Sequence, residues 1–337
     1  MARAAVLGAS GYLGGELLRL LTNHPRLAIA QVVSSGHPGT SLAALHPELP
    51  ALAGLTTVAG ADAVDADLAF LAQPPGEAMK VVPGLLERGI KVVDLGPDYR
   101  LPSPELYAAT YGMPHADPAH LSEAVYGLTE WFSEPVRSAR LVANPGCYPT
   151  ATLLALAPLL AAGELAGPVI VDAKSGTSGA GAALTAATHH PEAALTVQPY
   201  GLPSHRHLPE MRSALERLDT PAPPLVFVPH LVPVVRGILC SIYPTPAPAA
   251  HPDSWADALR AAYAGSPFVH VGGPPRLGWA TGTNHAFLSV TRSGEAPVLF
   301  SALDNLGKGG AAQAIQNANL MLGLPADAGL TAAGFGV

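Results

Sequence analysis

Cys147 is the residue whose type and setting point most directly to chemistry. It lies in the segment Asn-Pro-Gly-Cys-Tyr-Pro-Thr at 144–150, and an apolar stretch with helical character follows it. We therefore expect the thiol at or near a helix N-terminus, where the helix dipole and a nearby cation favour the nucleophilic thiolate. The alternative is a buried, inert cysteine. That description fits Cys240 better, because Cys240 lies inside the apolar run 237–243.

Two histidines close to an acid form the densest polar segment of the chain. Residues 204–210 are Ser-His-Arg-His-Leu-Pro-Glu, so His205 and His207 would point the same way if the segment were extended. Histidine titrates near neutral pH and is the usual general acid or base. A surface loop and a metal site with Glu210 are the alternatives. We expect no metal, because no cysteine or aspartate nearby completes a ligand set and no HxxxH or HExxH pattern is present.

Three glycines form a GxxGxxG pattern at Gly8, Gly11 and Gly14, between an apolar run at 4–7 and a helical pattern at 16–22. In such a strand–turn–helix the first glycine permits a tight turn and the second lets the backbone approach a pyrophosphate. The third lets the helix pack on the strand, and the helix N-terminus offers N–H groups to the phosphates. An ordinary glycine-rich turn is the alternative, but the strand and helix around it favour a dinucleotide site.

The end of the second expected strand indicates which dinucleotide would bind. NAD sites usually have an acid there that binds the ribose 2′-OH. The sequence at 33–37 is Val-Ser-Ser-Gly-His, which contains no acid. Ser34 and Ser35 leave room for a 2′-phosphate, so we expect NADP, although the arginine that often accompanies this phosphate is missing.

Several segments could bind an anion. Arg100 follows an expected strand end, where open α/β sheets bind ligands, and its guanidinium could hold a phosphate or carboxylate. The segment 175–181 supplies the hydroxyls of Ser175 and Ser178 together with flexible backbone amides. Arg236 lies beside another expected strand. The alternative for each arginine is a surface ion pair.

The elements that must position these residues fall into two groups. Strands alternate with helices up to about residue 144, which predicts a parallel, doubly wound sheet. Beyond that point, loops and paired strands indicate a second sheet. In the first group we expect strands at 4–7, 27–33, 68–71 and 92–95 and helices at 16–22 and 78–88. In the second group we expect helices at 152–162, 256–264 and 311–322 and strands at 169–173, 225–228, 238–243, 286–291 and 298–303.

Composition excludes several classes of protein. Of the 337 residues, 49 % are apolar and 13 % charged, and the net charge is −7 without a basic block, so we expect neither disorder nor a nucleic-acid surface. Two cysteines are too few for a disulfide framework. No signal peptide and no run of 18 apolar residues is recognisable, which leads us to expect a cytoplasmic protein without a membrane span.

Taken in chain order, these segments resemble the N-acetyl-γ-glutamyl-phosphate reductases, a family related to aspartate-semialdehyde dehydrogenase. The resemblance covers essentially the full length and rests on residues 8–14, 94–101, 124–128, 144–150, 174–181, 205–210, 229–233, 236–237, 282–284 and 304–309. It implies an α/β fold: a Rossmann doubly wound parallel sheet plus an α+β catalytic and dimerisation domain of the semialdehyde dehydrogenase type. The implied NADP-binding domain is 1–146, with 308–337 returning to it, and the catalytic domain is 147–307.

The resemblance also implies a reaction in arginine biosynthesis and the residues that perform it. Cys147 would attack an acyl phosphate, phosphate would leave, and NADPH would reduce the thioacyl enzyme to a semialdehyde. His207, with His205 beside it, would be the acid or base. The implied substrate-binding residues are Arg100, Asn144, Ser175, Ser178, Glu210 and Arg236. The implied cofactor-binding residues are Gly8, Ser10, Gly11, Tyr12, Gly14, Ser34, Ser35, Gly179, Lys308 and Asn317. A homodimer or homotetramer that acts on a small molecule is implied as well.

Two rival hypotheses differ from this one in substrate or in class. A lysine-biosynthesis relative reduces an aminoadipate phosphate carried by an acidic protein, and residues 189–192, His-His-Pro-Glu, resemble that branch. An acidic carrier calls for a basic rim, whereas this chain is net negative and has Ala182 where family members carry a basic residue. A non-catalytic sensor would bind NADPH without thiol chemistry. Two further departures from the family pattern are the lack of a histidine in 72–76 and the order Gly-Ala-Ala after Gly309.

Overall fold

The chain divides into two compact units in the computed structural model, which describes residues 1–218 and 221–336. The first unit contains Met1–Pro145 and Gly310–Thr331. The second contains Gly146–Gly309 and the described residues from Ala332 on.

Both ends of the segment 308–337 differ from the expected division, which assigned the whole segment to the first unit. Lys308 belongs to the second unit, where its backbone N–H donates to the carbonyl of Thr283. The C-terminal residues belong there too, because the N–H of Gly336 donates to the carbonyl of Gly278. Only the middle of the segment, which contains the last long helix, packs in the first unit.

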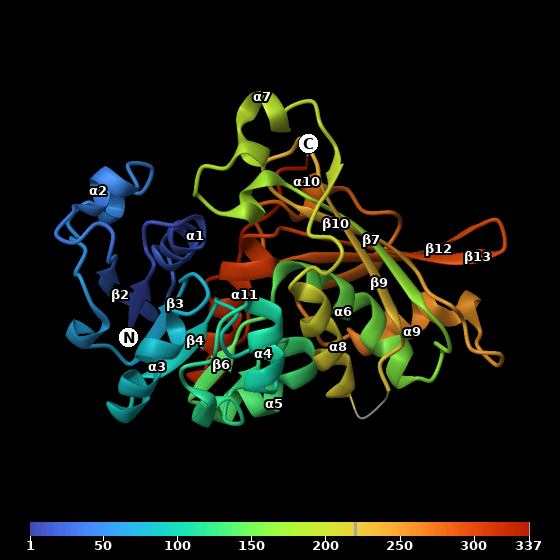
Figure 1. The fold of residues 1–337 in the computed structure, drawn as a ribbon, viewed down its shortest axis with the longest axis horizontal. Coiled ribbons are helices and arrows are strands. Elements are labelled where there is room, and N and C mark those ends of the chain that lie inside the picture. Colours follow the sequence, from blue (N-terminus) through green and yellow to red (C-terminus); the bar gives the residue numbers. More distant parts are fainter. Residues whose placement is uncertain (219–220, 337) are drawn as a thin grey trace. The chain divides into compact units, whose positions relative to one another are not determined.

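A parallel sheet of six strands forms the centre of the first unit (Figure 1). The strand order is β2-β1-β3-β4-β6-β5, and every neighbouring pair is parallel. The strands are β1 (Ala2–Leu7), β2 (Leu27–Val33), β3 (Leu68–Leu71), β4 (Lys91–Asp94), β5 (Val125–Tyr126) and β6 (Leu141–Ala143). Later strands lie on both sides of β1, which confirms the expected doubly wound order.

Helices cover this sheet, so its central strands are apolar on both sides. All four residues of β3 are buried, as are the last four of β1. The helices of this unit are α1 (Tyr12–Leu21), α2 (Leu42–Leu45), α3 (Ala78–Glu87), α4 (Pro104–Tyr111), α5 (Thr129–Ser138) and α11 (Ala312–Met321). The C-terminal helix α11 contacts α1, α5 and β4, so a segment from the end of the chain completes the first unit.

In the first unit the sequence patterns did not predict α2, α4, α5, β5 and β6. These elements carry weak signals: β5 has two residues and β6 three, while α5 is kinked at Phe132 and contains Pro135. The first helix also begins earlier than expected, at Tyr12, because Gly14 and Gly15 are helical. Glycine has a low helix propensity, so its presence concealed the true start of α1.

A mixed sheet of seven strands forms the second unit, with the order β11-β12-β13-β10-β7-β9-β8. The pairs β7–β9 and β11–β12 are parallel, and the other neighbours are antiparallel. The strands are β7 (Val169–Ser175), β8 (Gln198–Pro199), β9 (Leu225–Leu231), β10 (Ile238–Tyr243), β11 (Val269–Gly272), β12 (Ala286–Ser293) and β13 (Ala296–Leu303). This mixed sheet with its helices confirms the expected α+β class of the second domain.

One face of the mixed sheet is covered by helices, and α6, α8 and α9 lie along it (Figure 1). Along β7 and β9 buried residues alternate with more exposed ones, so the opposite face leaves Ile170 and Val226 exposed. Tyr243 of β10, which pairs with Ile170, is exposed as well. The helices of this unit are α6 (Cys147–Ala161), α7 (His190–Ala193), α8 (His207–Glu216), α9 (Trp255–Ala262) and α10 (Leu277–Ala280), and a π-helical segment, Gly307–Ala311, leads into α11.

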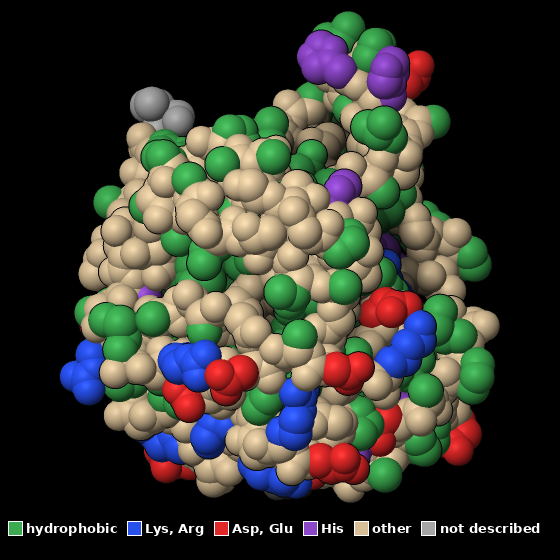
Figure 2. Space-filling model, turned by 90° about the vertical axis from the view of Figure 1, so that its left-hand side faces the viewer, with side chains coloured by type: hydrophobic (Ala, Val, Ile, Leu, Met, Phe, Trp, Pro, Cys, Tyr) green, Lys and Arg blue, Asp and Glu red, His purple; other side chains and the backbone are tan. Residues whose placement is uncertain are grey.

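Surface charge is mixed in sign on the face drawn in Figure 2, where lysine and arginine side chains lie among aspartate and glutamate. Histidine side chains gather at the tip that α7 forms, in keeping with the exposure of His189 and His190. Among the described residues, no helix is both long and apolar enough to cross a membrane.

Candidate active site

The glycine turn between β1 and α1 is built by close backbone contacts in the first unit. Gly8 has a φ of 81°, and a Cβ there would overlap the carbonyl oxygen of Ala72. A Cβ on Gly14 would overlap the carbonyl oxygen of Gly8, so the first turn of α1 packs directly on the preceding turn. At Gly11, by contrast, the nearest atom to a Cβ is that same oxygen at an ordinary 3.6 Å. Gly11 is therefore not required by the packing of the protein itself.

The start of α1 combines a glycine backbone with one partly exposed side chain. Gly11 is its N-cap residue and makes no side-chain cap bond, while Tyr12 is half-exposed. Beside this turn the Ser10 and Ser34 hydroxyls lie 3.1 Å apart, so the structure joins the glycine turn to the end of β2. Ser35 follows in an exposed segment. Such a turn can hold a dinucleotide pyrophosphate at the helix N-terminus, with the serines near the ribose.

A buried amide cluster lies at the other end of this sheet's carboxyl edge. Asn317 on α11 donates from Nδ2 to the carbonyl of Gly127 at 2.9 Å and to Oδ1 of Asn144 at 3.0 Å. Asn144 in turn donates to the carbonyl of Gly310. The Oδ1 atom of Asn317 is buried and has no hydrogen-bond partner within the described residues. An unsatisfied buried acceptor is costly, and a carboxamide N–H₂ of a bound ligand would satisfy it.

Arg100 is buried and holds two strand ends together. Its Nε donates to the carbonyl of Asn144 at 2.8 Å, and its Nη2 donates to the carbonyl of Leu95 at 2.6 Å. Asp94, at the end of β4, is fully buried; burial and the charge of Asp98 raise the pKa of this carboxyl to about 7, against the opposing charge of Arg100. The arginine thus lies at a strand end of the kind that binds ligands, where it already stabilises local backbone.

In the second unit, Cys147 is the first residue of α6 and is half-buried. Its N-cap residue, Gly146, donates its N–H to Oε1 of Glu210 at 2.7 Å. Gly309 packs against the cysteine so closely that a Cβ at 309 would lie 2.7 Å from Cys147 Cβ. The thiol therefore lies at a helix N-terminus, where the helix dipole favours a thiolate. Because residues 146 and 309 are glycines, neither has a side chain that covers the backbone of Cys147.

The two histidines lie together, but not in the extended geometry that the sequence suggested. His207 begins α8, and its N–H donates to Nδ1 of His205 at 3.1 Å, with the two ring centroids 4.9 Å apart. The segment is not extended, because residues 207–216 form a helix, and the side chain of His205, two residues before it, accepts the N–H of its first residue. The ring of Tyr148, next to the cysteine, packs against both histidine rings, with centroid distances of 5.8 Å to His205 and 5.9 Å to His207.

His205 is neutral at physiological pH. Burial, and secondarily the charge of Arg206, lowers the pKa of its imidazole to about 4. Because Nδ1 accepts the N–H of His207, the single ring proton lies on Nε2. Glu210 lies one turn further along α8, so its carboxylate joins the start of α8 to the start of α6. The nucleophile candidate and both histidines therefore share one local framework.

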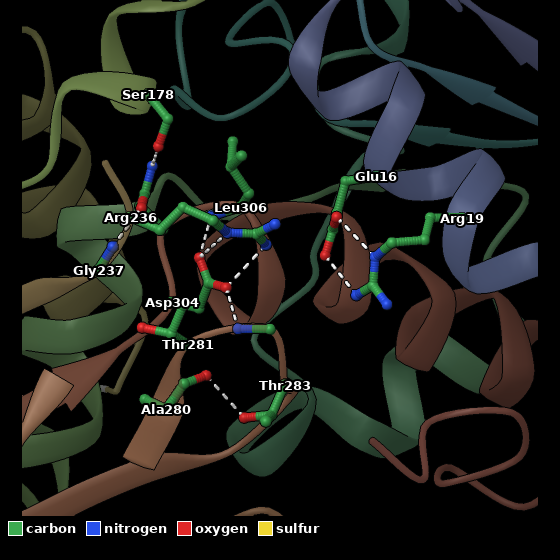
Figure 3. A network of polar contacts seen from close by, with 12 residues as sticks. Glu16, Arg19, Ser178, Arg236, Gly237, Ala280, Thr281, Thr283, Asp304 and Leu306 are labelled. Carbon is green, nitrogen blue, oxygen red and sulfur yellow. Dashed lines mark hydrogen bonds and ion pairs between the residues drawn. The ribbon is translucent and has the colours of Figure 1, made fainter. Parts of the chain in front are cut away.

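A second polar network surrounds Arg236 (Figure 3). Its guanidinium binds the buried carboxylate of Asp304 through Nε at 3.2 Å and Nη2 at 2.7 Å. Asn305 accepts from the N–H of Gly237 at 2.7 Å and donates to the Ser178 hydroxyl at 2.9 Å. Arg236 and Ser178, two expected substrate residues, are thus linked through Asp304 and Asn305, which are neighbours in the chain. These roles of Asp304 and Asn305 were not predicted from the sequence, although both residues lie in a segment that carries the family resemblance.

The remaining expected residues lie around this network. The buried Ser175 hydroxyl donates to the carbonyl of Gly176, and Gly179 packs against it, with a Cβ there 3.2 Å from Ser175 Oγ. Lys308 is fully buried in the second unit, and its Nζ lies 5.7 Å from the centre of the Phe268 ring. Among the described residues, no three or more His, Cys, Asp and Glu side chains are grouped to bind a metal.

Comparison with known proteins adds two domain families. Residues 3–139 match the model for the semialdehyde dehydrogenase NAD binding domain, and residues 147–305 match that for the semialdehyde dehydrogenase dimerisation domain. The first match contains the glycine turn, and the second begins at the cysteine of α6.

Curated relatives match over almost their whole length. A protein named N-acetyl-gamma-glutamyl-phosphate reductase from Halorhodospira halophila is 44 % identical, with 98 % of each chain covered. Proteins of the same name from Methanosphaerula palustris and Geobacillus stearothermophilus are 43 % and 41 % identical, with 98 % and 96 % of each chain covered.

Solved structures of low identity share the fold. An aspartate semialdehyde dehydrogenase II from Vibrio cholerae, complexed with ASA, has a TM-score of 0.72 at 18 % identity, covering 96 % of this chain and 98 % of that one. An aspartate semialdehyde dehydrogenase with NADP from Candida albicans has a TM-score of 0.68 at 16 % identity, with the same coverage.

Proposed function

The chain belongs to the N-acetyl-γ-glutamyl-phosphate reductase family, and from this premise we propose that it reduces N-acetyl-γ-glutamyl phosphate to N-acetylglutamate semialdehyde and phosphate in arginine biosynthesis. The reductant is NADPH. The observation that carries the proposal is the placement of Cys147 at the start of α6, next to Tyr148, whose ring packs against two histidines. The chain is also 44 % identical over its length to a protein of that name. A sensor without chemistry would have no need of a thiol held in this way.

Cys147 is the proposed nucleophile. Its thiolate attacks the acyl carbon of the substrate, the C–O bond to phosphate breaks, and a thioacyl enzyme forms. When bound, the dinucleotide would supply the hydride for this thioester carbon. The oxygen of the resulting thiohemiacetal accepts a proton from the general acid and returns it as the C–S bond breaks, which releases the aldehyde and restores the thiolate. The helix dipole at the start of α6 stabilises the sulfur anion at both ends of the cycle.

His207 is the proposed acid or base, because the ring of His205 already accepts a backbone hydrogen bond. A pKa of about 4 keeps His205 neutral at pH 7, and its Nδ1 accepts the backbone N–H of His207. The side chain of His205 therefore holds the N–H of the first residue of α8, while His207 gives a proton to the reacting oxygen and takes it back. Glu210 fixes the same two helix starts relative to each other; the substrate contact that we expected for it remains a prediction.

The dinucleotide would occupy the first unit. We assign the pyrophosphate to the turn at Gly8–Gly14, with Ser10 and Tyr12, and the 2′-phosphate to Ser34 and Ser35, since no acid lies there to repel it. The buried, unpartnered Oδ1 of Asn317 fits a nicotinamide carboxamide. The family resemblance also implies cofactor contacts for Gly179 and Lys308.

The acyl phosphate would be held by charge and hydroxyl groups. We assign the phosphate to Arg100, Ser175 and Ser178, and the α-carboxylate to Arg236. We also propose that Asn144 contacts the substrate. Asp304 keeps the guanidinium of Arg236 in one orientation through two contacts, which suits recognition of a planar carboxylate.

We further propose that the protein is a homodimer, or a tetramer built from such dimers. The second family match is described as a dimerisation domain, and the uncovered face of its sheet exposes Ile170, Val226 and Tyr243. Burying this face against a second copy would remove apolar surface from water. The proposed location is the cytoplasm, because Cys147 must stay reduced to act.

The test is an assay of phosphate-dependent NADP⁺ reduction with N-acetylglutamate semialdehyde, run beside carrier-bound aminoadipate semialdehyde. We expect turnover with the first substrate, dependence on added phosphate, and a lower KM for NADP⁺ than for NAD⁺. Turnover of only the carrier-bound compound would overturn the proposed substrate. NADPH binding without turnover of either compound would support the sensor hypothesis instead.

A further inference from the structure

The last described residues of the chain leave α11 and pack on the second unit. Gly334 lies against the backbone of Trp279, where a Cβ would overlap the carbonyl oxygen. The N–H of Gly336 donates to the carbonyl of Gly278 at 3.0 Å. A glycine at 334 is therefore needed for this contact, and the tail is held by backbone as well as by side chain.

Between these glycines, Phe335 packs over the loop that follows α10. Its ring atoms lie 3.4–3.9 Å from the position of a Cβ on Gly282, which has a φ of 83°. The side chain is nevertheless 71 % exposed. A ring so exposed contributes little apolar burial to global stability, so its contact acts locally on the Gly282 loop.

The Gly282 loop is bound to the residue that holds Arg236. The N–H of Gly282 donates to Oδ2 of Asp304, and the carboxylate of Asp304 binds the Arg236 guanidinium (Figure 3). The adjacent Thr283 accepts the N–H of Lys308 through its carbonyl. Phe335 therefore lies over a loop that is hydrogen-bonded to Asp304, which in turn binds Arg236.

We propose that the C-terminal tail, through Phe335, is a positioning element for Arg236 and so sets the affinity for the carboxylate end of the substrate. This inference rests on the proposed function, in which Arg236 binds that carboxylate. The ring restrains the Gly282 loop, the loop fixes Asp304, and Asp304 orients the guanidinium. A small displacement of a bidentate arginine weakens its fit to a carboxylate, whereas the cofactor turn of the first unit is untouched.

The test compares Phe335→Ala with the conservative Phe335→Tyr and with a chain that ends at Ala333. For Phe335→Ala and the shortened chain we expect the KM for N-acetylglutamate semialdehyde to rise about 5- to 10-fold. We expect kcat and the KM for NADP⁺ to change less than about 2-fold, and the melting temperature to stay constant. Phe335→Tyr keeps the ring and should keep the original KM. An unchanged KM in Phe335→Ala, or an equal rise in both KM values, overturns the proposal.

A double variant shows whether the tail acts through the arginine. In an Arg236→Lys background, Phe335→Ala should add no further rise in the semialdehyde KM, because residues coupled along one path are not additive. A full additional rise would place the effect elsewhere and overturn the inference. Failure of the proposed function itself would be recognised separately, as absence of semialdehyde turnover by the unmodified protein.

Discussion

Two strand–helix turns of this molecule share a backbone arrangement but differ in the residues at the start of the helix. The β1–α1 turn and the β6–α6 turn each lead from a buried strand through a glycine N-cap, Gly11 and Gly146, into a helix without a side-chain cap bond. In the first, the helix begins at Tyr12 and has glycines at its third and fourth residues, Gly14 and Gly15. In the second, the first helical residue is Cys147, and Glu210 takes the N–H of the N-cap residue.

The difference shows how one structural device supports two chemistries. A helix N-terminus offers partial positive charge and N–H groups to any anion. Where no side chain intervenes, as at Gly11, the anion can be a ligand phosphate. Where a cysteine stands first, the anion is its own thiolate. The residues in the first turn therefore decide whether the helix start binds or reacts, and each can be tested separately.

Removing the thiol should have the largest effect. Cys147→Ser replaces the sulfur by a hydroxyl that is hardly ionised at pH 7, so we expect kcat to fall by about 10³-fold or more. NADPH affinity, measured by quenching of protein fluorescence or by calorimetry, should stay within about 2-fold. Activity within tenfold of the original would contradict a reactive role for the second turn.

The other cysteine supplies the matched control. Cys240 is buried in β10, and burial raises the pKa of its thiol to about 12. At pH 8 it is almost wholly protonated, so iodoacetamide should label Cys147 and leave Cys240 unmodified, and Cys240→Ser should retain activity. Equal labelling of both cysteines would show that the start of α6 confers no special reactivity.

The first turn can be broken in two distinguishable ways. A methyl group at Gly11 meets only an ordinary contact within the protein, whereas one at Gly14 overlaps the carbonyl of Gly8. Gly11→Ala should therefore raise the dissociation constant for NADPH about tenfold or more without lowering the melting temperature. Gly14→Ala should destabilise the fold by about 1–3 kcal/mol, seen in urea unfolding. If Gly11→Ala binds NADPH normally, the pyrophosphate does not lie on this turn.

The parts of this site that depend on neighbouring residues could be predicted from the sequence. The glycine turn follows from spacing between a strand and a helix, and the position of Cys147 follows from the apolar helix after it. Parallel topology follows from the alternation of strands and helices up to residue 144. These features are local in sequence, so their physics is visible there.

What could not be predicted depends on partners far apart in the chain. Glu210 binds the N–H of Gly146, 64 residues away, and Arg236 binds Asp304 across 68. Nothing in either local segment specifies such a partner. The helix at His207 was missed for a different reason: its first turn contains a proline and polar residues, which the pattern equally allows in a loop.

Removing the acid that supports the second turn should have an intermediate effect. Glu210→Ala leaves the N–H of Gly146 without its acceptor and loosens α8 from α6, so we expect kcat to fall about 10-fold. Glu210→Gln keeps an oxygen that can accept the same N–H and should retain most of the activity. Equal losses in both variants would mean that the carboxylate charge, rather than this hydrogen bond, matters.

The smallest expected effect concerns Asp94, whose carbonyl accepts the N–H of Asn144 and so holds the strand entering the second turn. Burial raises the pKa of its carboxyl to about 7. Between pH 4 and 7 the unfolded chain has lost this proton while the folded chain keeps it, so stability falls as pH rises and levels off above 7. Asp94→Asn cannot ionise. The melting temperature of the variant should therefore rise relative to that of the original protein as pH increases from 4 to 7, by at least about 2–4 °C. Above pH 7 the difference between the two melting temperatures should stay constant. A gap that closes with rising pH would show instead that the ionised carboxylate stabilises this strand end, through the charge of Arg100.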